Sequence, residues 1–199
     1  MCIRDSRSGV YVVPASHPWD LELSSNLINP TMREQIIPQV IDHFGRLDIL
    51  VNNAGALGLN LHDSLELMVV APHDLSQRAA GCMLDGGHIV NVLSISAFQG
   101  ARNISEYIAA KHALLGLTRA MAIELAPKIH VNAIAPGHIE TDMLAQMTPE
   151  RRAFLESITP AGRFGRPEEV ADALMYLINS TYIYGQTIVV DGGWLVKNG

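Results

Sequence analysis

From residue 20 onward, short apolar runs rich in valine, isoleucine and leucine alternate with longer segments in which apolar positions recur with helical spacing. Apolar runs with little alternation of polar residues are typical of strands that are covered on both faces. Strands that alternate with helices predict an α/β fold, in which a parallel sheet is connected by crossover helices. The expected strands are residues 21–27, 47–52, 88–94, 130–135 and 187–190.

The helical segments lie between these runs, and several carry start signals. Asn29 followed by Pro30 predicts a helix start, and the apolar spacing from Ile36 onward continues this helix to Phe44. Pro38 lies inside the stretch, and we expect it to kink the helix. Further helices are expected over residues 64–84 and 106–125, from Thr148 as a short helix, and from Arg166 as the last helix.

The first nineteen residues do not follow this pattern. Residues 1–6 have no apolar central region and no small-residue cleavage site, so they do not form a signal peptide. They look like the translated end of a sequencing adapter, and the alternative is an ordinary terminus. Residues 9–13 could form a strand, although Pro14 and Pro18 interrupt any continuation. We therefore interpret residues 1–19 as artefactual or poorly ordered, and residues 20–199 as one partial domain that natural sequence would precede.

Composition and charge narrow the classes of partner. Hydrophobic residues make up 48% of the 199 residues and charged residues 17%, which is typical of a folded globular protein. The net charge of −6 argues against nucleic acid or an anionic membrane, and no apolar run approaches the roughly 20 residues of a membrane helix. Cys2 and Cys82 are the only cysteines and the histidines are scattered, which predicts neither a disulfide framework nor a metal site. We expect a cytoplasmic protein.

Asn53, Ala54 and Gly55 directly follow the strand expected at residues 47–52. In an open parallel sheet, ligands bind outside the carboxyl ends of the strands, so this turn would face a binding crevice. Small side chains there allow a flat ring or a ribose to approach the backbone. Taken alone, a turn rich in asparagine and glycine is more often only a turn.

Ser94, Tyr107 and Lys111 carry the strongest chemical signal. Tyr107 and Lys111 are four residues apart and share one helix face, while Ser94 ends an expected strand thirteen residues before Tyr107. An ammonium beside a phenol favours the phenolate, so we expect Lys111 to lower the pKa of Tyr107 toward working pH. The Ser94 hydroxyl would stabilise charge on a carbonyl oxygen that exchanges a proton with Tyr107. Together the three residues predict a site that moves a proton to or from a carbonyl oxygen.

A proline-glycine turn, Pro136-Gly137, follows the strand expected at residues 130–135. It would lie at the next strand end that faces the crevice, where backbone groups and Thr141 could hold a carboxamide. Alone it would be only a loop, and we interpret Glu140 as a solvated acid.

Five stretches, taken together, resemble the short-chain dehydrogenase/reductase family in its non-extended form. They are residues 44–55, 87–94, 107–111, 131–137 and 185–193, in the order that the family has them. The resemblance extends from about residue 26 to residue 194. It implies a Rossmann-type doubly wound parallel sheet, and an oxidoreductase that uses NAD or NADP on an alcohol or ketone.

The same resemblance implies roles for individual residues. Tyr107 would be the acid or base, Ser94 would polarise the carbonyl group, and Lys111 would lower the tyrosine pKa and bind the nicotinamide ribose. Asn26 and Leu27 would lie near adenine, Asn53 to Gly55 along the adenosine side, and Ile139 and Thr141 at the nicotinamide carboxamide. The residues implied to contact the cofactor are Asn26, Leu27, Asn53, Ala54, Gly55, Tyr107, Lys111, Pro136, Gly137, Ile139 and Thr141.

The chain departs from the family pattern in two respects that bear on function. No Gly-x-x-x-Gly-x-Gly stretch precedes residue 40, so the first strand and the loop that binds the pyrophosphate are missing, together with the residue that separates NAD from NADP. Met68 takes the place of the family's relay asparagine, and Asn60 is nearby in sequence without a basis for that role. We therefore expect the 199-residue chain to bind NADH and NADPH weakly or not at all.

Two functional hypotheses follow. The first is an oxidoreductase whose substrate could be a 3-oxoacyl thioester, a sugar, a steroid-like alcohol or a pterin, and the amphipathic segment at residues 144–161 does not choose between them. The second is a non-catalytic truncated chain that retains only surfaces for assembly or partner binding. The resemblance implies a homo-oligomer, a tetramer or a dimer, formed through the helices at residues 64–84 and 106–125 and the last strand.

Overall fold

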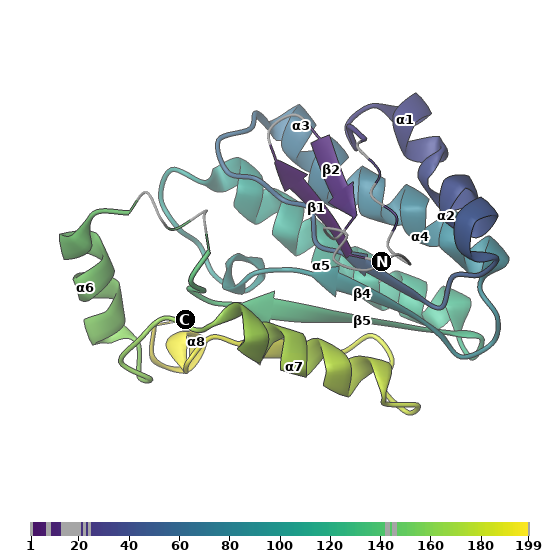
Figure 1. The fold of residues 1–199 in the computed structure, drawn as a ribbon. Helices are drawn as coiled ribbons and strands as arrows, with labels where there is room; N and C mark the ends of the chain where they lie inside the picture. Colours follow the sequence, from purple (N-terminus) through teal and green to yellow (C-terminus); the bar gives the residue numbers. More distant parts are fainter. Residues whose placement is uncertain are drawn as a thin grey trace.

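A central six-stranded sheet organises the described part of the chain (Figure 1). The computed structural model describes residues 2–6, 9–12, 21, 23, 25–141, 144 and 147–198, with the backbone alone for residues 2–6, 9–12 and 198. The strands are β1 (Cys2–Ser6), β2 (Gly9–Val12), β3 (Ile49–Asn52), β4 (Gly87–Val92), β5 (Ile129–Pro136) and β6 (Thr187–Val190). Their order across the sheet is β2-β1-β3-β4-β5-β6; β2 is antiparallel to β1, and every other neighbouring pair is parallel.

Four of the five expected strands are confirmed, with small changes at their ends. The strand expected over residues 21–27 is wrong, because its described residues form loop and turn. Leu27 is only 3% exposed, and Leu21 and Leu23 pack against the same core, so the apolar run belongs to a buried loop. At the amino-terminus, β2 matches the strand considered for residues 9–13, whereas β1 lies where the sequence predicts no strand.

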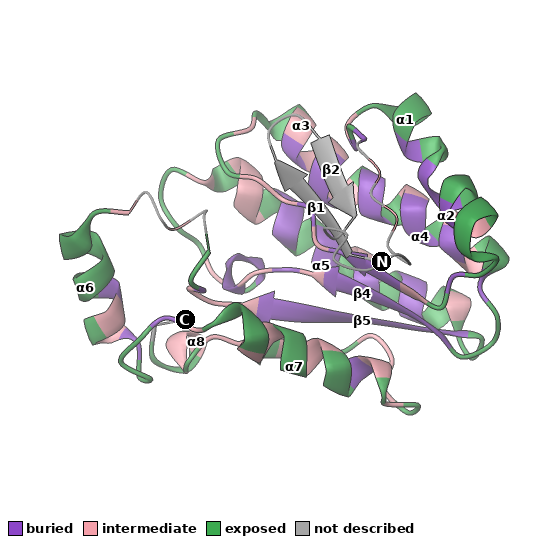
Figure 2. Cartoon of the chain, viewed as in Figure 1, coloured by how far each residue is buried: buried purple, intermediate pink, exposed green. Residues whose placement is uncertain are grey.

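Helices cover both faces of the sheet (Figures 1 and 2). On one face lie α2 (Ile36–Phe44), α4 (Ala71–Cys82) and α5 (Ser105–Leu125), and on the other lies α7 (Pro167–Ile178). The remaining helical elements are α1 (Pro30–Glu34), α3 (Leu61–Leu65), the π-helical segment η1 (Glu66–Val70), the 3-10 turn η2 (Ile95–Ala97), α6 (Pro149–Ile158) and α8 (Trp194–Asn198). The parallel sheet with flanking helices is therefore confirmed, although α7 is not the last helix, because α8 follows it.

The helix expected over residues 29–44 is interrupted at Gln35, which separates α1 from α2. The Asn29 side chain caps α1 as predicted, by accepting hydrogen bonds from two backbone N–H groups of its first turn. Pro38 falls in the first turn of α2, where the missing N–H leaves no intrahelical hydrogen bond unmade. The helix is thus interrupted before the proline, and the expected kink at Pro38 is not found.

The segment expected as one helix over residues 64–84 runs through three consecutive elements, α3, η1 and α4. The middle element is a π-helical turn, which adds one residue to the regular helical repeat and is frequent at functional sites. Met68 lies in this turn and is fully buried. The local geometry of Met68 is therefore set by an irregularity that hydrophobic spacing does not reveal.

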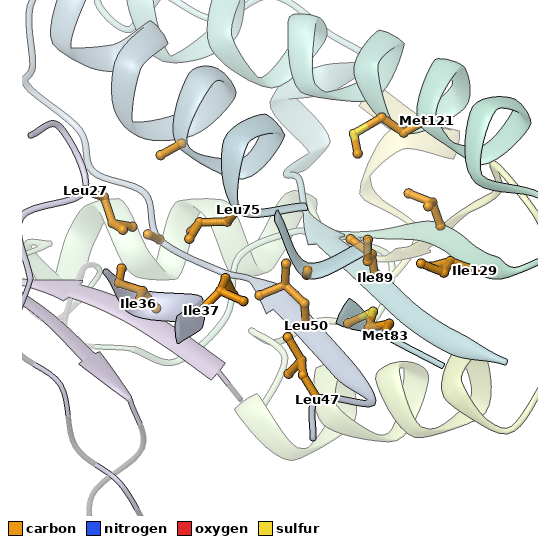
Figure 3. Close-up of a cluster of buried hydrophobic side chains, with 14 of the residues drawn as sticks. Leu27, Ile36, Ile37, Leu47, Leu50, Leu75, Met83, Ile89, Met121 and Ile129 are labelled. Atoms are coloured by element: carbon orange, nitrogen blue, oxygen red, sulfur yellow. The ribbon is translucent and has the colours of Figure 1, made fainter. Parts of the chain in front are cut away.

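The main hydrophobic core lies between the sheet and the helices α2, α4 and α5 (Figure 3). Leu50 of β3 and Ile89 of β4 are fully buried in it. A smaller cluster on the opposite face joins Val90 and Ile134 to Leu177 of α7. In Figure 2, β4 and β5 are buried along most of their length, as the continuous apolar runs predicted.

A chain of buried side-chain hydrogen bonds fixes the strands β3 and β4 against the helices. Asn52 Nδ2 donates to Ser76 Oγ of α4 at 3.0 Å and to Asn91 Oδ1 at 2.8 Å. Asn91 Nδ2 in turn donates to Thr118 Oγ1 of α5 at 2.9 Å. Because buried polar groups are costly without partners, this network specifies how the end of β3 is placed.

Candidate active site

The carboxyl ends of β3, β4 and β5 meet at one edge of the sheet, because the three strands run parallel. Gly55 lies in the turn after β3, Ser94 lies two residues beyond β4, and Pro136 ends β5. The fold therefore brings the three predicted turns to the same edge.

Ser94 is positioned by the 3-10 turn that it begins. Its Oγ atom accepts a hydrogen bond from the backbone N–H of Ser96 at 3.1 Å. A side-chain hydrogen bond joins Ser94 to Tyr107, which lies in the first turn of α5. The two hydroxyl groups thus meet, as the sequence predicts.

Lys111 lies one helical turn beyond Tyr107 and is only 3% exposed. Its Nζ atom donates a 2.7 Å hydrogen bond to the carbonyl oxygen of Val92 and lies 5.5 Å from the centre of the Tyr107 ring. Burial lowers the pKa of this lysine to about 8, because the interior disfavours the charged form. The ammonium therefore lies beside the phenol, close to the end of β4.

The pKa of Tyr107 shifts in the direction opposite to the one predicted from the sequence. We expected the neighbouring ammonium to lower it, but burial raises the pKa of this tyrosine. The hydrogen bond with Ser94 lowers the pKa and only partly offsets the burial. The sequence places the two groups one turn apart, but it does not show how far the fold covers the phenol, and this burial sets the direction.

Gly55 lies against both Met68 and Lys111. A Cβ atom on this glycine would lie 3.4 Å from Met68 Sδ and 3.5 Å from Lys111 Nζ. The missing side chain leaves space beside the ammonium, and a thioether, which carries no exchangeable proton, borders that space. Asn60 is occupied elsewhere, since its Oδ1 atom caps α3 by accepting from the N–H of Asp63 at 2.9 Å.

The two residues that the resemblance places near adenine lie in different environments. Asn26 is exposed, and its Oδ1 atom accepts a hydrogen bond from the N–H of Ile28 at 3.0 Å. The buried side chain of Leu27 lines a small cavity that also touches Ala54. A nucleotide at this turn would therefore contact the backbone of Leu27, because the side chain faces the core.

Packing shapes the loop after β5. A Cβ atom on Gly137 would lie 2.8 Å from the Cα atom of Asp191, so the close approach of the two segments requires glycine here. Ile139 is 8% exposed and pairs with Gly165 in an isolated parallel bridge. Thr141 is exposed, and its hydroxyl donates to the carbonyl oxygen of Ile139 at 3.4 Å. Packing alone accounts for Gly137, whereas Thr141 lies at the accessible end of the loop.

Sequence reasoning missed one buried cation near this edge. Arg33 is 4% exposed and donates a hydrogen bond to the carbonyl oxygen of Leu27. A charged residue at a helical position normally indicates the solvent face, so no signal in the sequence marked it.

Within the described ranges, no three His, Cys, Asp or Glu side chains gather in a way that could hold a metal ion. Of the helices placed by the structure, none combines the length and apolar character needed to cross a membrane.

Comparison with known proteins gives matches along nearly the whole chain. The family profile described as Enoyl-(Acyl carrier protein) reductase matches residues 15–195. The 3-oxoacyl-[acyl-carrier-protein] reductase FabG of Thermotoga maritima is 36% identical over 194 residues, which cover 85% of this chain and 76% of that protein.

Solved structures are similar over a comparable span. A short-chain dehydrogenase/reductase from Brucella melitensis, titled glucose/ribitol dehydrogenase, has a TM-score of 0.85 at 28% identity, covering 89% of this chain and 78% of that one. A blue fluorescent protein from a metagenomic library, solved in complex with NADPH, has a TM-score of 0.80 at 32% identity, covering 85% and 74% of the two chains.

Proposed function

The chain belongs to the short-chain dehydrogenase/reductase family and is an NAD(P)-dependent oxidoreductase, and we propose that Ser94, Tyr107 and Lys111 carry its reaction. The reaction interconverts an alcohol and a ketone on a small-molecule substrate. A proton is exchanged at the hydroxyl of Tyr107, beside the hydroxyl of Ser94. The nicotinamide group supplies or accepts the hydride when the cofactor is bound.

The buried ammonium of Lys111 is the observation that carries this proposal. It has three N–H donors, and within the described part of the chain its acceptor is the carbonyl oxygen of Val92, with no carboxylate paired to it. A buried charge is destabilising until hydrogen bonds satisfy it. The two hydroxyl groups of a ribose would supply the further acceptors, and the absence of a side chain at Gly55 would let them approach the ammonium from that side. The site therefore fits the nicotinamide ribose.

Tyr107 and Ser94 have different roles at the substrate oxygen: the tyrosine exchanges a proton with it, and the serine stabilises its charge. Burial raises the pKa of Tyr107, so in the direction of reduction the tyrosine is protonated and can donate to the carbonyl oxygen. The Ser94 hydroxyl stabilises the negative charge that develops on that oxygen. In the direction of oxidation, the hydrogen bond from Ser94 favours the phenolate that accepts the alcohol proton.

The remaining cofactor contacts follow the edge of the sheet. We place the adenosine side along residues 53–55 and the backbone of residues 26 and 27, and the nicotinamide carboxamide at residues 136–141. NADPH is bound by the blue fluorescent protein, and NADH by a 4-hydroxyisoleucine dehydrogenase of similar structure. Both cofactors suit this proposal.

The proposed substrate class is a 3-oxoacyl thioester or a related ketone, which the name of the Thermotoga maritima relative supports. We also propose a cytoplasmic homo-oligomer, either a dimer or a tetramer. Ile123 on α5 is 82% exposed, and Met175 and Tyr176 on α7 are 51% and 59% exposed. Apolar side chains exposed to this extent on two helices favour burial against another copy of the chain.

Nucleotide binding and turnover test the function together. We expect reduced nicotinamide mononucleotide to bind the full chain in the millimolar range, and NADH or NADPH, although bound only weakly, to reduce a 3-oxoacyl thioester when supplied at high concentration. Lys111→Met should abolish nucleotide binding, whereas Lys128→Met, which removes an exposed lysine, should leave it unchanged. If the unsubstituted 199-residue chain, called the parent chain below, is folded and binds none of these nucleotides, the non-catalytic hypothesis is supported instead.

A further inference from the structure

Arg33 of α1 is buried although it carries a charge. Its Nη1 atom donates to the carbonyl oxygen of Leu27 at 2.7 Å and approaches Glu66 Oε2 at 3.5 Å. Its Nε atom donates to Asp74 Oδ2 at 2.9 Å. One guanidinium thus joins the turn before α1 to both η1 and α4.

The arrangement differs from an ordinary surface ion pair. A guanidinium is a rigid, planar donor, so it holds its acceptors in a defined geometry. A second arginine, Arg78, binds the other carboxylate oxygen of Asp74 at 2.9 Å and binds Glu34 at 3.1 Å, but it does so near the surface. Because the Arg33 charge is buried, the loss of one of its acceptors would destabilise the fold.

The turn that Arg33 contacts is itself closed by hydrogen bonds. The N–H of Asn29 donates to the carbonyl oxygen of Asn26 at 3.0 Å, and the N–H of Ile28 donates to Asn26 Oδ1 at 3.0 Å. Asn29 then caps α1, and Arg33 reaches back from that helix to the Leu27 carbonyl. The backbone at Leu27 is therefore held both by the turn and by the helix that follows it.

Leu27 lies beside the proposed nucleotide site. Its side chain lines a small cavity together with Ala54 and Leu75, and Figure 3 shows Leu27 and Leu75 at the same end of the core. Ala54 precedes Gly55, whose missing side chain adjoins Lys111. The segment from Ala54 to Gly55 thus connects the Leu27 turn to the buried ammonium.

We propose that Arg33 is a positioning residue for cofactor binding, which holds the backbone of Asn26 and Leu27 as the wall against the adenosine half of NAD or NADP. The inference rests on the function proposed above. It adds a residue that touches neither cofactor nor substrate. Because Arg33 acts on the adenosine end alone, its loss weakens the binding of AMP and leaves the binding of reduced nicotinamide mononucleotide unchanged.

The test uses the two halves of the cofactor, AMP and reduced nicotinamide mononucleotide, as half-nucleotides. Their dissociation constants on the full chain are measured by saturation-transfer NMR, which detects weak binding. Arg33→Met removes the buried charge together with its hydrogen bonds. Arg33→Lys keeps the charge, and so remains informative if Arg33→Met fails to fold. Arg78→Met is the matched control, because it removes an arginine from the same ion cluster without a contact to Leu27. AMP affinity should fall about fivefold to tenfold in Arg33→Lys, as expected for one lost hydrogen bond, and change by less than about twofold in Arg78→Met.

Each other outcome has a distinct meaning. Unchanged AMP affinity in a folded Arg33→Lys variant, even with a lower melting temperature, overturns the inference, since the arginine would then serve stability alone. Equal weakening of both half-nucleotides also overturns it. A parent chain that binds reduced nicotinamide mononucleotide but not AMP overturns this inference and leaves the proposed function standing. A parent chain that binds neither overturns both.

Discussion

The ammonium of Lys111 donates a 2.7 Å hydrogen bond to the carbonyl oxygen of Val92, the last residue of β4. This contact holds the cation at the strand end from which Ser94 follows two residues later. The burial that fixes it also lowers the pKa of Lys111 to about 8. The same placement therefore serves the proposed site and destabilises the free chain.

Lys111→Met should stabilise the fold near neutral pH while removing the oxidoreductase activity. The folded chain releases the Lys111 proton near pH 8 and the unfolded chain near pH 10.5, so the parent's free energy of unfolding rises between these values. The penalty present below pH 8 is about 3 kcal/mol at most. Urea unfolding at pH 7 and pH 10 checks this: the advantage of the variant should shrink at the higher pH. A variant that is less stable than the parent at pH 7 would contradict it.

Tyr107→Phe should lower turnover without weakening nucleotide binding. The phenylalanine keeps the ring that packs near Lys111 but has no proton to exchange, and a general acid typically contributes roughly 10²- to 10⁴-fold in rate. Steady-state rates with the ketone substrate, together with a titration with reduced nicotinamide mononucleotide, separate the two effects. Turnover within about threefold of the parent would remove the role proposed for Tyr107.

Ser94→Ala should slow the reaction and shift its pH profile. The hydrogen bond from Ser94 lowers the pKa of Tyr107, so its loss raises that pKa further. Alcohol oxidation requires the phenolate, and its rate should therefore begin to rise at a higher pH in the variant. A loss of roughly 10²-fold in kcat is expected from one missing donor to the substrate oxygen. A pH profile with an unshifted basic limb would show that the serine does not tune the tyrosine.

Gly137→Ala should destabilise the fold by about 1–3 kcal/mol, a range typical of overpacking. The new Cβ atom would lie 2.8 Å from two atoms of Asp191, so the loop after β5 and the segment after β6 must separate. Gly100→Ala is the matched control, because nothing lies within 4 Å of its Cβ position. Thermal unfolding of the two variants tests the difference, and equal melting temperatures would show that the loop moves freely.

The proposed site could be predicted largely because its signals are local. Tyr107 and Lys111 share a helix face through their spacing, and Ser94 follows a recognisable strand by two residues. The direction of the tyrosine pKa could not be predicted, because burial by distant segments decides it. Whether a polar group is excluded from water depends on the packing of the whole fold.

The fold shows the same division between local and distant causes. Asn29 predicts a helix start because its own side chain can cap the helix, and in the structure it is the N-cap of α1. The run from Leu21 to Leu27 has a strand-like composition, but its leucines fill the edge of the core from a loop. Arg33 gave no signal, since its carboxylate acceptors come from α4 and η1, more than thirty residues away along the chain.

The π-helical segment η1, which contains Met68, determines which side chain packs against Gly55. Deleting one residue from it would restore a regular α-helix and rotate α3 relative to α4 by about 100°, the angle of one helical residue. Met68 would then turn away from Gly55, and a neighbour would take its place without any substitution. The side chain that packs against Gly55 thus depends on the extra residue in η1. The loss of a single codon there would replace Met68 with a different residue at this position.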